Sequence, residues 1–386
     1  MVIGVALLFR YADFVMLLGG TEFHLGWIVG AGMVGSLVVR LALGSCIDRY
    51  GTMVVWIGSA MLLAASCFAN LAVTSHRGVA IYLLRVLFCC GHAGIAGASM
   101  TFVSGRGSTR RIAEMVGMLG TSGFLGMMLG ALLGDLMLGS VTVDRGGVER
   151  MFIVAGTLVS LSCPLAWLAT RAEAPSRPLP GSSSLGVLRR HHPGTVLAVG
   201  MAMGLGLGLP AVFLRTYTAE LHIPRIGGFF LVYTATAIVA RVLSRRWPER
   251  FGNRRMILLG TGALVASTLL FLAVRMEWQL VLPAIGFGCS HAILFPAVMA
   301  AGNATFPAPH RGLAIVLVLA ASDLGQLVGA PATGAILKWS RSAGLAPYPT
   351  MFLAMAGLMT LAGIWYSIAS RPTTQRQEAT AVHGER

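Results

Sequence analysis

The sequence predicts an all-α membrane protein with twelve transmembrane helices in two pseudo-symmetric six-helix bundles. Its composition, the number of its apolar segments and an internal repeat predict this fold class. Of 386 residues, 56% are hydrophobic and only 11% are charged, whereas a soluble domain carries about 25% charged residues. Because single water-soluble cores stop growing near about 250–300 residues, so much apolar surface must face lipid.

The same composition excludes a soluble enzyme, a nucleic-acid-binding domain and a disordered protein. The net charge is +15, but the basic residues lie in short clusters between apolar runs. The partner that these clusters indicate is the anionic surface of the lipid bilayer, not nucleic acid. The six cysteines form no CxxC pair and no Cys/His spacing suited to zinc, so we expect free thiols, no metal and no cofactor.

Twelve segments are long and apolar enough to cross a bilayer, which takes about 20 residues. They are 1–18, 25–46, 52–71, 78–103, 112–139, 150–170, 195–216, 226–245, 256–274, 279–303, 311–338 and 349–370.

The segment 171–194 divides these helices into two sets of six. It is rich in Pro, Ser and Gly and ends in basic residues, which is typical of a linker. The expected domains are therefore an N-terminal bundle (1–170), the linker, a C-terminal bundle (195–370) and a polar tail (371–386). Loops on the linker's side carry more than twice as many basic residues as the opposite loops, so the linker, the tail and both termini are predicted to be cytoplasmic.

The two bundles share a repeat. The run from Arg40 to Gly51 recurs from Arg241 to Gly252, and Phe88–Ala93 recurs as Phe287–Ala292, each about 200 residues further along. Parallel repeats of this kind are typical of transporters whose halves rock against each other.

The segment Gly44-x-x-x-Asp48-Arg49-x-Gly51 resembles the signature loop between helices 2 and 3 of the major facilitator superfamily. The second half keeps Glu249, Arg250 and Gly252 in the equivalent loop. Glycines of the fifth segment are spaced as in that family's antiporters, with counterparts in the eleventh: Gly117, Gly126, Gly130, Gly134, Gly325 and Gly329. Bare faces of this kind allow close helix packing, which suggests a sliding surface.

The resemblance implies the major facilitator fold, a cell-membrane location and a monomer. It also implies that the loop around Asp48 is a conformational latch, which closes the cytoplasmic side in one of two states. A carboxylate that forms charge-assisted bonds in one state only biases the equilibrium between the states.

Charged residues inside the predicted helices are candidates for proton coupling or substrate binding, because a charge in the bilayer needs a partner or water. Arg10 and Asp13 share one helix face, and Asp323 lies one turn before Gln326. For each of these pairs, a structural tie between helices is the alternative.

His92 and His291 occupy equivalent places in the repeat, and Arg85 lies early in the fourth segment. Histidine titrates near neutral pH, so the pair suits proton transfer; packing is the alternative for both, and snorkelling to the membrane surface is the alternative for Arg85. The remaining charges near helix ends are interpreted as interfacial: Glu22, Glu114, Asp135, Arg215 and Glu220.

The function that these observations favour is secondary active transport of a small solute, with proton-coupled efflux as the first hypothesis. Proton-linked uptake of a sugar, carboxylate or peptide is the alternative, and another coupling ion stays open. An intramembrane enzyme is disfavoured, since no HExxH or GxSxG motif is present. A non-transporting sensor is disfavoured because the sequence shows no large extra cytoplasmic segment. A Walker loop cannot occur, because the sole lysine, Lys338, is followed by Trp339.

Overall fold

The computed structural model describes residues 1–104, 109–138, 143–171, 194–306 and 311–370. Within these ranges every regular element is a helix, and ten helices are long and apolar enough to cross a membrane. The predicted all-α membrane fold is therefore confirmed, while the number of twelve spans stays a prediction. Most of the linker and the whole tail lie outside the described residues.

The helices follow the predicted segments closely. In the first half of the chain they are α1 (Val2–Leu7), η1 (Leu8–Arg10), α2 (Tyr11–Leu17), α3 (Glu22–Ala69), η2 (Asn70–Ala72), α4 (Val79–Ser104), α5 (Thr109–Leu138), α6 (Arg145–Ser160) and α7 (Ser162–Thr170). In the second half they are α9 (Thr195–Glu220), α10 (Gly227–Ser244), α11 (Trp247–Leu270), η3 (Phe271–Ala273), η4 (Glu277–Leu280), α12 (Val281–Ala304), α13 (Arg311–Ser342) and α14 (Pro347–Ala369).

Two predicted segments are interrupted, 150–170 only at Leu161 between α6 and α7, and two are joined. The first segment is split by the tight turn η1, which ends at Arg10; such turns inside helices often mark functional sites. The segments 25–46 and 52–71 run together as α3, whose 48 residues would extend about 72 Å if straight. That is more than twice the bilayer core of about 30 Å, so α3 must turn back on itself.

The turn in α3 lies at Gly51, whose φ is +82°, and Gly252 in α11 has φ +76° at the equivalent place. L-residues with a Cβ rarely adopt this conformation. The final glycine of each repeated loop is thus required by the backbone, since it reverses the chain between two membrane-crossing helices.

We expect Gly51→Ala to destabilise the protein by about 1–3 kcal/mol, the cost of holding a residue with a Cβ at positive φ and extended ψ, a region essentially limited to glycine. The thermal unfolding midpoint of the purified protein measures this. Gly58→Ala is the matched control, because Gly58 is helical in the same element and no atom lies within 4 Å of its Cβ position. An equal effect of the two substitutions would contradict the requirement for glycine at position 51.

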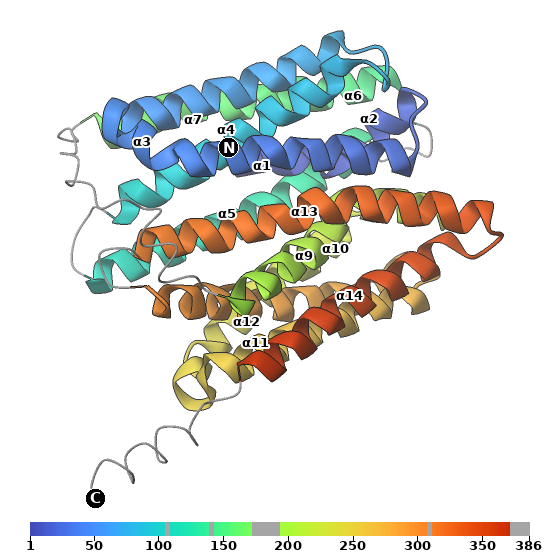
Figure 1. Cartoon of the computed structure of the whole chain (residues 1–386). Coiled ribbons are helices and arrows are strands. Elements are labelled where there is room, and N and C mark those ends of the chain that lie inside the picture. The colour runs from blue at the N-terminus through green and yellow to red at the C-terminus, as the bar shows by residue number, and fades with distance from the viewer. Residues whose placement is uncertain (105–108, 139–142, 172–193, 307–310, 371–386) are drawn as a thin grey trace, which may run out of the picture.

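The two halves of the chain lie one above the other in Figure 1, with the first half uppermost. The contact surface between the two halves is named the seam. Across the seam α3 packs against α13, and α5 packs against α10. The repeat relates these two contacts, because α3 corresponds to α10 and α5 to α13. At one end of the bundle, named the Glu22 end, lie the starts of α3, α10 and α14 and the ends of α5, α9 and α13. At the other, named the linker end, lie Gly51, Gly252, Thr170 and Thr195.

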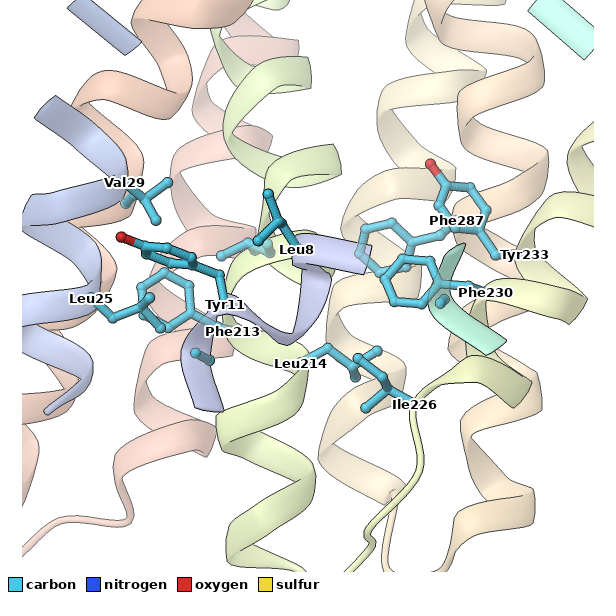
Figure 2. Packing of buried hydrophobic residues seen from close by; sticks show 14 of the residues in the cluster. Leu8, Tyr11, Leu25, Val29, Phe213, Leu214, Ile226, Phe230, Tyr233 and Phe287 are labelled. Carbon is cyan, nitrogen blue, oxygen red and sulfur yellow. The ribbon is translucent and has the colours of Figure 1, made fainter. Parts of the chain in front are cut away.

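The broken first helix is packed into the middle of the molecule. Figure 2 shows Leu8 and Tyr11 with Leu25 and Val29 of α3 on one side and Phe213 and Leu214 of α9 near by. All six side chains are buried. The first helix therefore touches both halves, which places Arg10 and Asp13 at the seam.

Candidate functional site

A cluster of four charges lies at the seam: Arg10, Asp13 and Arg215 are buried and Asp135 is largely buried. Arg10 is fully buried and its Nε donates to Asp13, while its Nη1 lies 2.8 Å from Asp135 Oδ1. Arg215 of α9 completes the cluster, with Nε 2.8 Å from Asp13 Oδ1 at an angle that makes this an ion pair and not a hydrogen bond. Two arginines and two carboxylates give zero net charge, which allows them to be buried together.

Asp135 also holds the start of α10. Its carboxylate accepts hydrogen bonds from the backbone N–H groups of Ile226, at 2.9 Å, and Gly227. A carboxylate is favourable at a helix N-terminus, where N–H groups lack partners. Since Asp135 belongs to α5 and Gly227 to α10, this contact joins the two halves.

The cluster is divided unequally between the halves. Arg10, Asp13 and Asp135 belong to the first half and have a net charge of −1, whereas Arg215 in the second half supplies +1. Separation of the halves at this point would leave one carboxylate charge in the first half without its counter-ion.

A second ion pair crosses the seam closer to the linker end. Asp323 of α13 accepts from Ser36 and from Arg40 of α3, with Arg40 Nε at 2.5 Å. Arg40, Arg85 and Asp323 all lie close enough to act electrostatically on His92. The His92 side chain is exposed although it lies midway along α4, so the structure brings Asp323 and His92 into one region.

The repeat produces a matching contact on the other side of the seam, in which an aromatic ring replaces the carboxylate. Arg241, the counterpart of Arg40, lies with its guanidinium carbon 5.3 Å from the ring centre of Phe124, which stands where Asp323 stands in α13. His291 Nδ1 lies 2.6 Å from the Tyr233 hydroxyl, and its ring contacts Phe124. The two histidines therefore occupy equivalent positions with different chemistry.

The Glu22 end is tied across the seam. Arg341 of α13 makes two bonds to Glu22, at 2.7 and 2.8 Å, and lies 3.3 Å from Glu220. Beside them α3 and α13 meet backbone to backbone: a Cβ on Gly26 would lie 2.4 Å from Ala330 O, and one on Gly334 would lie 2.6 Å from Glu22 O. This end of the seam is closed.

The predicted latch residues show no comparable contact at the linker end. Asp48, Arg49, Glu249 and Arg250 are exposed, and within the described part of the chain none of them forms an ion pair. No atom lies within 4 Å of a Cβ placed on Gly44, Gly51 or Gly252. The predicted latch residues therefore make no ion pair among the described residues, while the Glu22 end is tied.

The predicted packing glycines lie inside the halves and not at the seam. Gly126 and Gly130 face Val2, Ile3 and Ala6 of α1, and Gly134 faces Arg10. Gly325 and Gly329 face Met201 and Leu205 of α9. The surroundings of Gly117 lie outside the described residues. The glycines at which α3 and α13 approach each other closely across the seam are instead Gly26, Gly30 and Gly334.

Gln326 lies against Gly208 of α9. Arg85 of α4 stacks on Tyr11 and Phe88. No group of three or more His, Cys, Asp or Glu suited to a metal is present in the described ranges. All six cysteines are free.

The interpretation of Asp135 and Arg215 as interfacial residues was wrong, because Arg215 is buried, Asp135 is largely buried, and both complete the charge cluster. A usable signal was present, since both lie within the apolar segments 112–139 and 195–216. Arg40, the partner of Asp323, was noted only as part of the repeat.

Ten apolar helices in the described ranges, arranged in two halves with charges paired across the seam, define a multi-pass membrane protein. The sequence model of the Major Facilitator Superfamily matches residues 2–248 and 195–384, so the chain belongs to that superfamily. It is accordingly a membrane transporter and not an enzyme.

Three similar proteins illustrate the relationship. An uncharacterized MFS-type transporter of Burkholderia pseudomallei strain 1106a is 25% identical over 350 residues, covering 88% of this chain and 81% of the relative. The crystal structure of a variant of the nucleoside transporter NupG superposes with a TM-score of 0.79 at 13% identity, covering 96% and 98% of the two chains. The structure of a bacterial homologue of the human lysosomal transporter Spinster superposes with a TM-score of 0.70 at 14% sequence identity, covering 96% of this chain and 93% of the homologue.

Proposed function

We propose that this transporter exports a small solute by alternating access and is driven by protons that enter. The observation that carries the proposal is the division of the buried cluster into −1 in the first half and +1 in the second. When the Glu22 end opens, Arg215 leaves Asp13, and a proton can replace it. When that end closes, Arg215 returns and displaces the proton.

The arrangement of the two ends supports two alternating states. Arg341, Glu22 and the Asp135 contact hold the Glu22 end shut, while the Asp48 loop is free at the linker end. In the opposite state the latch would engage and these ties would break. Each state thus has its own bonds, which is the requirement for a two-state equilibrium that a solute and a proton can shift.

Export is favoured over uptake because the glycines of α5 are spaced like those of the superfamily's antiporters. Proteoliposomes loaded with a pH-sensitive dye test both coupling and direction. With a transported solute added outside, antiport makes the lumen alkaline as protons leave, whereas symport makes it acidic. No pH change during measurable solute flux would remove proton coupling from the proposal, and acidification would favour the uptake alternative.

The proposed orientation in the cell membrane places the linker and both termini in the cytoplasm. We expect an impermeant maleimide added to intact cells to leave Ser183→Cys unlabelled, in a background without the six natural cysteines. Thr74→Cys, exposed beside the start of α4 at the Glu22 end, is the matched position that should react. Strong labelling at 183 together with none at 74 would reverse the orientation.

A further inference from the structure

Two residues that touch in the first half each carry a buried polar atom with no hydrogen-bond partner in the described part of the chain. These atoms are Nε of Arg85 in α4 and the hydroxyl of Tyr11 in α2. Tyr11 is 4% exposed, so water does not satisfy its hydroxyl. Buried polar groups are nearly always partnered in folded proteins, and two adjacent exceptions point to a missing ligand.

The Arg85 side chain is held in place on three sides. Its guanidinium carbon lies 4.7 Å from the ring centre of Tyr11 and 5.0 Å from that of Phe88. Gly32 of α3 provides the room, because a Cβ there would lie 2.8 Å from Arg85 Cγ. The two aromatic rings hold the position of the guanidinium, and its Nε donor has no hydrogen-bond partner among the described residues. A group fixed in this way loses little entropy on binding.

Arg85 is also a cation without a counter-ion. In the described residues the three carboxylates buried at the seam, Asp13, Asp135 and Asp323, are each paired with another arginine. An unpaired charge inside a membrane protein is costly. Arg85 keeps partial exposure, and His92, two turns further along α4, is exposed, so an anion can reach this face of the helix.

We propose that Arg85 and Tyr11 bind the carboxylate of a small organic anion, and that this anion is the transported solute. The proposal rests on the transport function above and adds the chemical class of the solute. The planar edge of a guanidinium matches a carboxylate with two parallel hydrogen bonds. One unpaired cation neutralises one carboxylate, whereas a phosphate dianion would leave a buried negative charge.

Binding to the purified full-length protein in detergent tests the class directly. The probes are three carboxylates, each with the alcohol that replaces its carboxylate: gluconate with sorbitol, lactate with propylene glycol, and benzoate with benzyl alcohol. We expect at least one carboxylate to raise the thermal unfolding midpoint while its alcohol does not. Failure of all three carboxylates, equal shifts by the alcohols, or an equal shift by inorganic phosphate would overturn the proposal.

Variants locate the bound carboxylate. Arg85→Gln should weaken its affinity by about tenfold to a hundredfold, the effect of losing a charge-assisted hydrogen bond, and Arg85→Lys should restore part of it. Arg77→Gln removes the same charge from an exposed position near the start of α4 and is the control. Unchanged affinity in Arg85→Gln would overturn the assignment of the site.

Tyr11→Phe separates ligand binding from packing, because it removes only the unpartnered hydroxyl. Without ligand the variant should be as stable as the natural protein or more stable, since no hydrogen bond is lost. Its carboxylate affinity should nevertheless fall several-fold. An unchanged affinity would show that the hydroxyl is not part of the site. These measurements need no pH gradient, so loss of proton coupling and loss of carboxylate binding are distinguishable results.

Discussion

Replacing Gly26 by leucine should reduce the transport rate by about tenfold to a hundredfold, because the Glu22 end could no longer close. A Cβ at this position would lie 2.4 Å from Ala330 O of α13. Overpacking costs about 1–3 kcal/mol even where side chains can adjust. Here the obstacle is backbone, so α3 and α13 can avoid it only by moving apart. The protein should then remain in the state that is open at the Glu22 end.

Accessibility of a buried position at that end provides the measurement. Phe230, near the start of α10, is buried at the seam, with its ring centre 4.5 Å from that of Phe9. Phe230→Cys should therefore be unreactive toward a water-soluble maleimide alone and reactive when combined with Gly26→Leu. Gly357→Leu is the control for added bulk, because Gly357 is exposed on α14 with no atom within 4 Å of its Cβ position. Full transport by Gly26→Leu, with Phe230→Cys still unreactive, would refute closure through this contact.

The fold could be predicted from the sequence because its signals are local. Each helix is specified by a run of apolar residues, and the bend in α3 by a glycine within a repeated loop. The contact of Arg10 with Asp13 was likewise predictable, since residues three apart share a helix face. What the periodicity did not show was the 3₁₀ turn that ends at Arg10; this turn allows the arginine to donate also to the carbonyl of Leu138.

The seam could not be predicted in the same way, because its contacts join residues far apart in the chain. Asp323 meets Arg40 across a separation of 283 residues, and nothing in either segment specifies the other. Asp135 and Arg215 were misplaced for a related reason. A charge near a helix end is usually solvated, and only the packing of α5 and α9 around the first helix shows that these two side chains are buried together.

The second large effect is expected from Asp13→Asn, which should abolish accumulation driven by a pH gradient while downhill exchange of solute stays measurable. Asparagine keeps the size and an acceptor oxygen but cannot take up a proton when Arg215 departs. It also removes one negative charge from the buried cluster, which leaves Arg215 unpaired and lowers stability. Loss of coupling must therefore be separated from loss of folding.

A double variant makes that separation. Combining Asp13→Asn with Arg215→Gln returns the cluster to zero net charge, with the Arg10–Asp135 pair intact. Its thermal stability should recover toward that of the natural protein, yet gradient-driven accumulation should stay absent, because no group is left to exchange a proton for an arginine. Glu149→Gln, which breaks an exposed ion pair on α6, should leave coupling unchanged. Recovery of coupling in the double variant would assign Asp13 a structural role only.

Full gradient-driven flux in both Asp13→Asn and Asp323→Asn would refute carboxylate coupling altogether, and His92 and His291 would then be the groups to substitute.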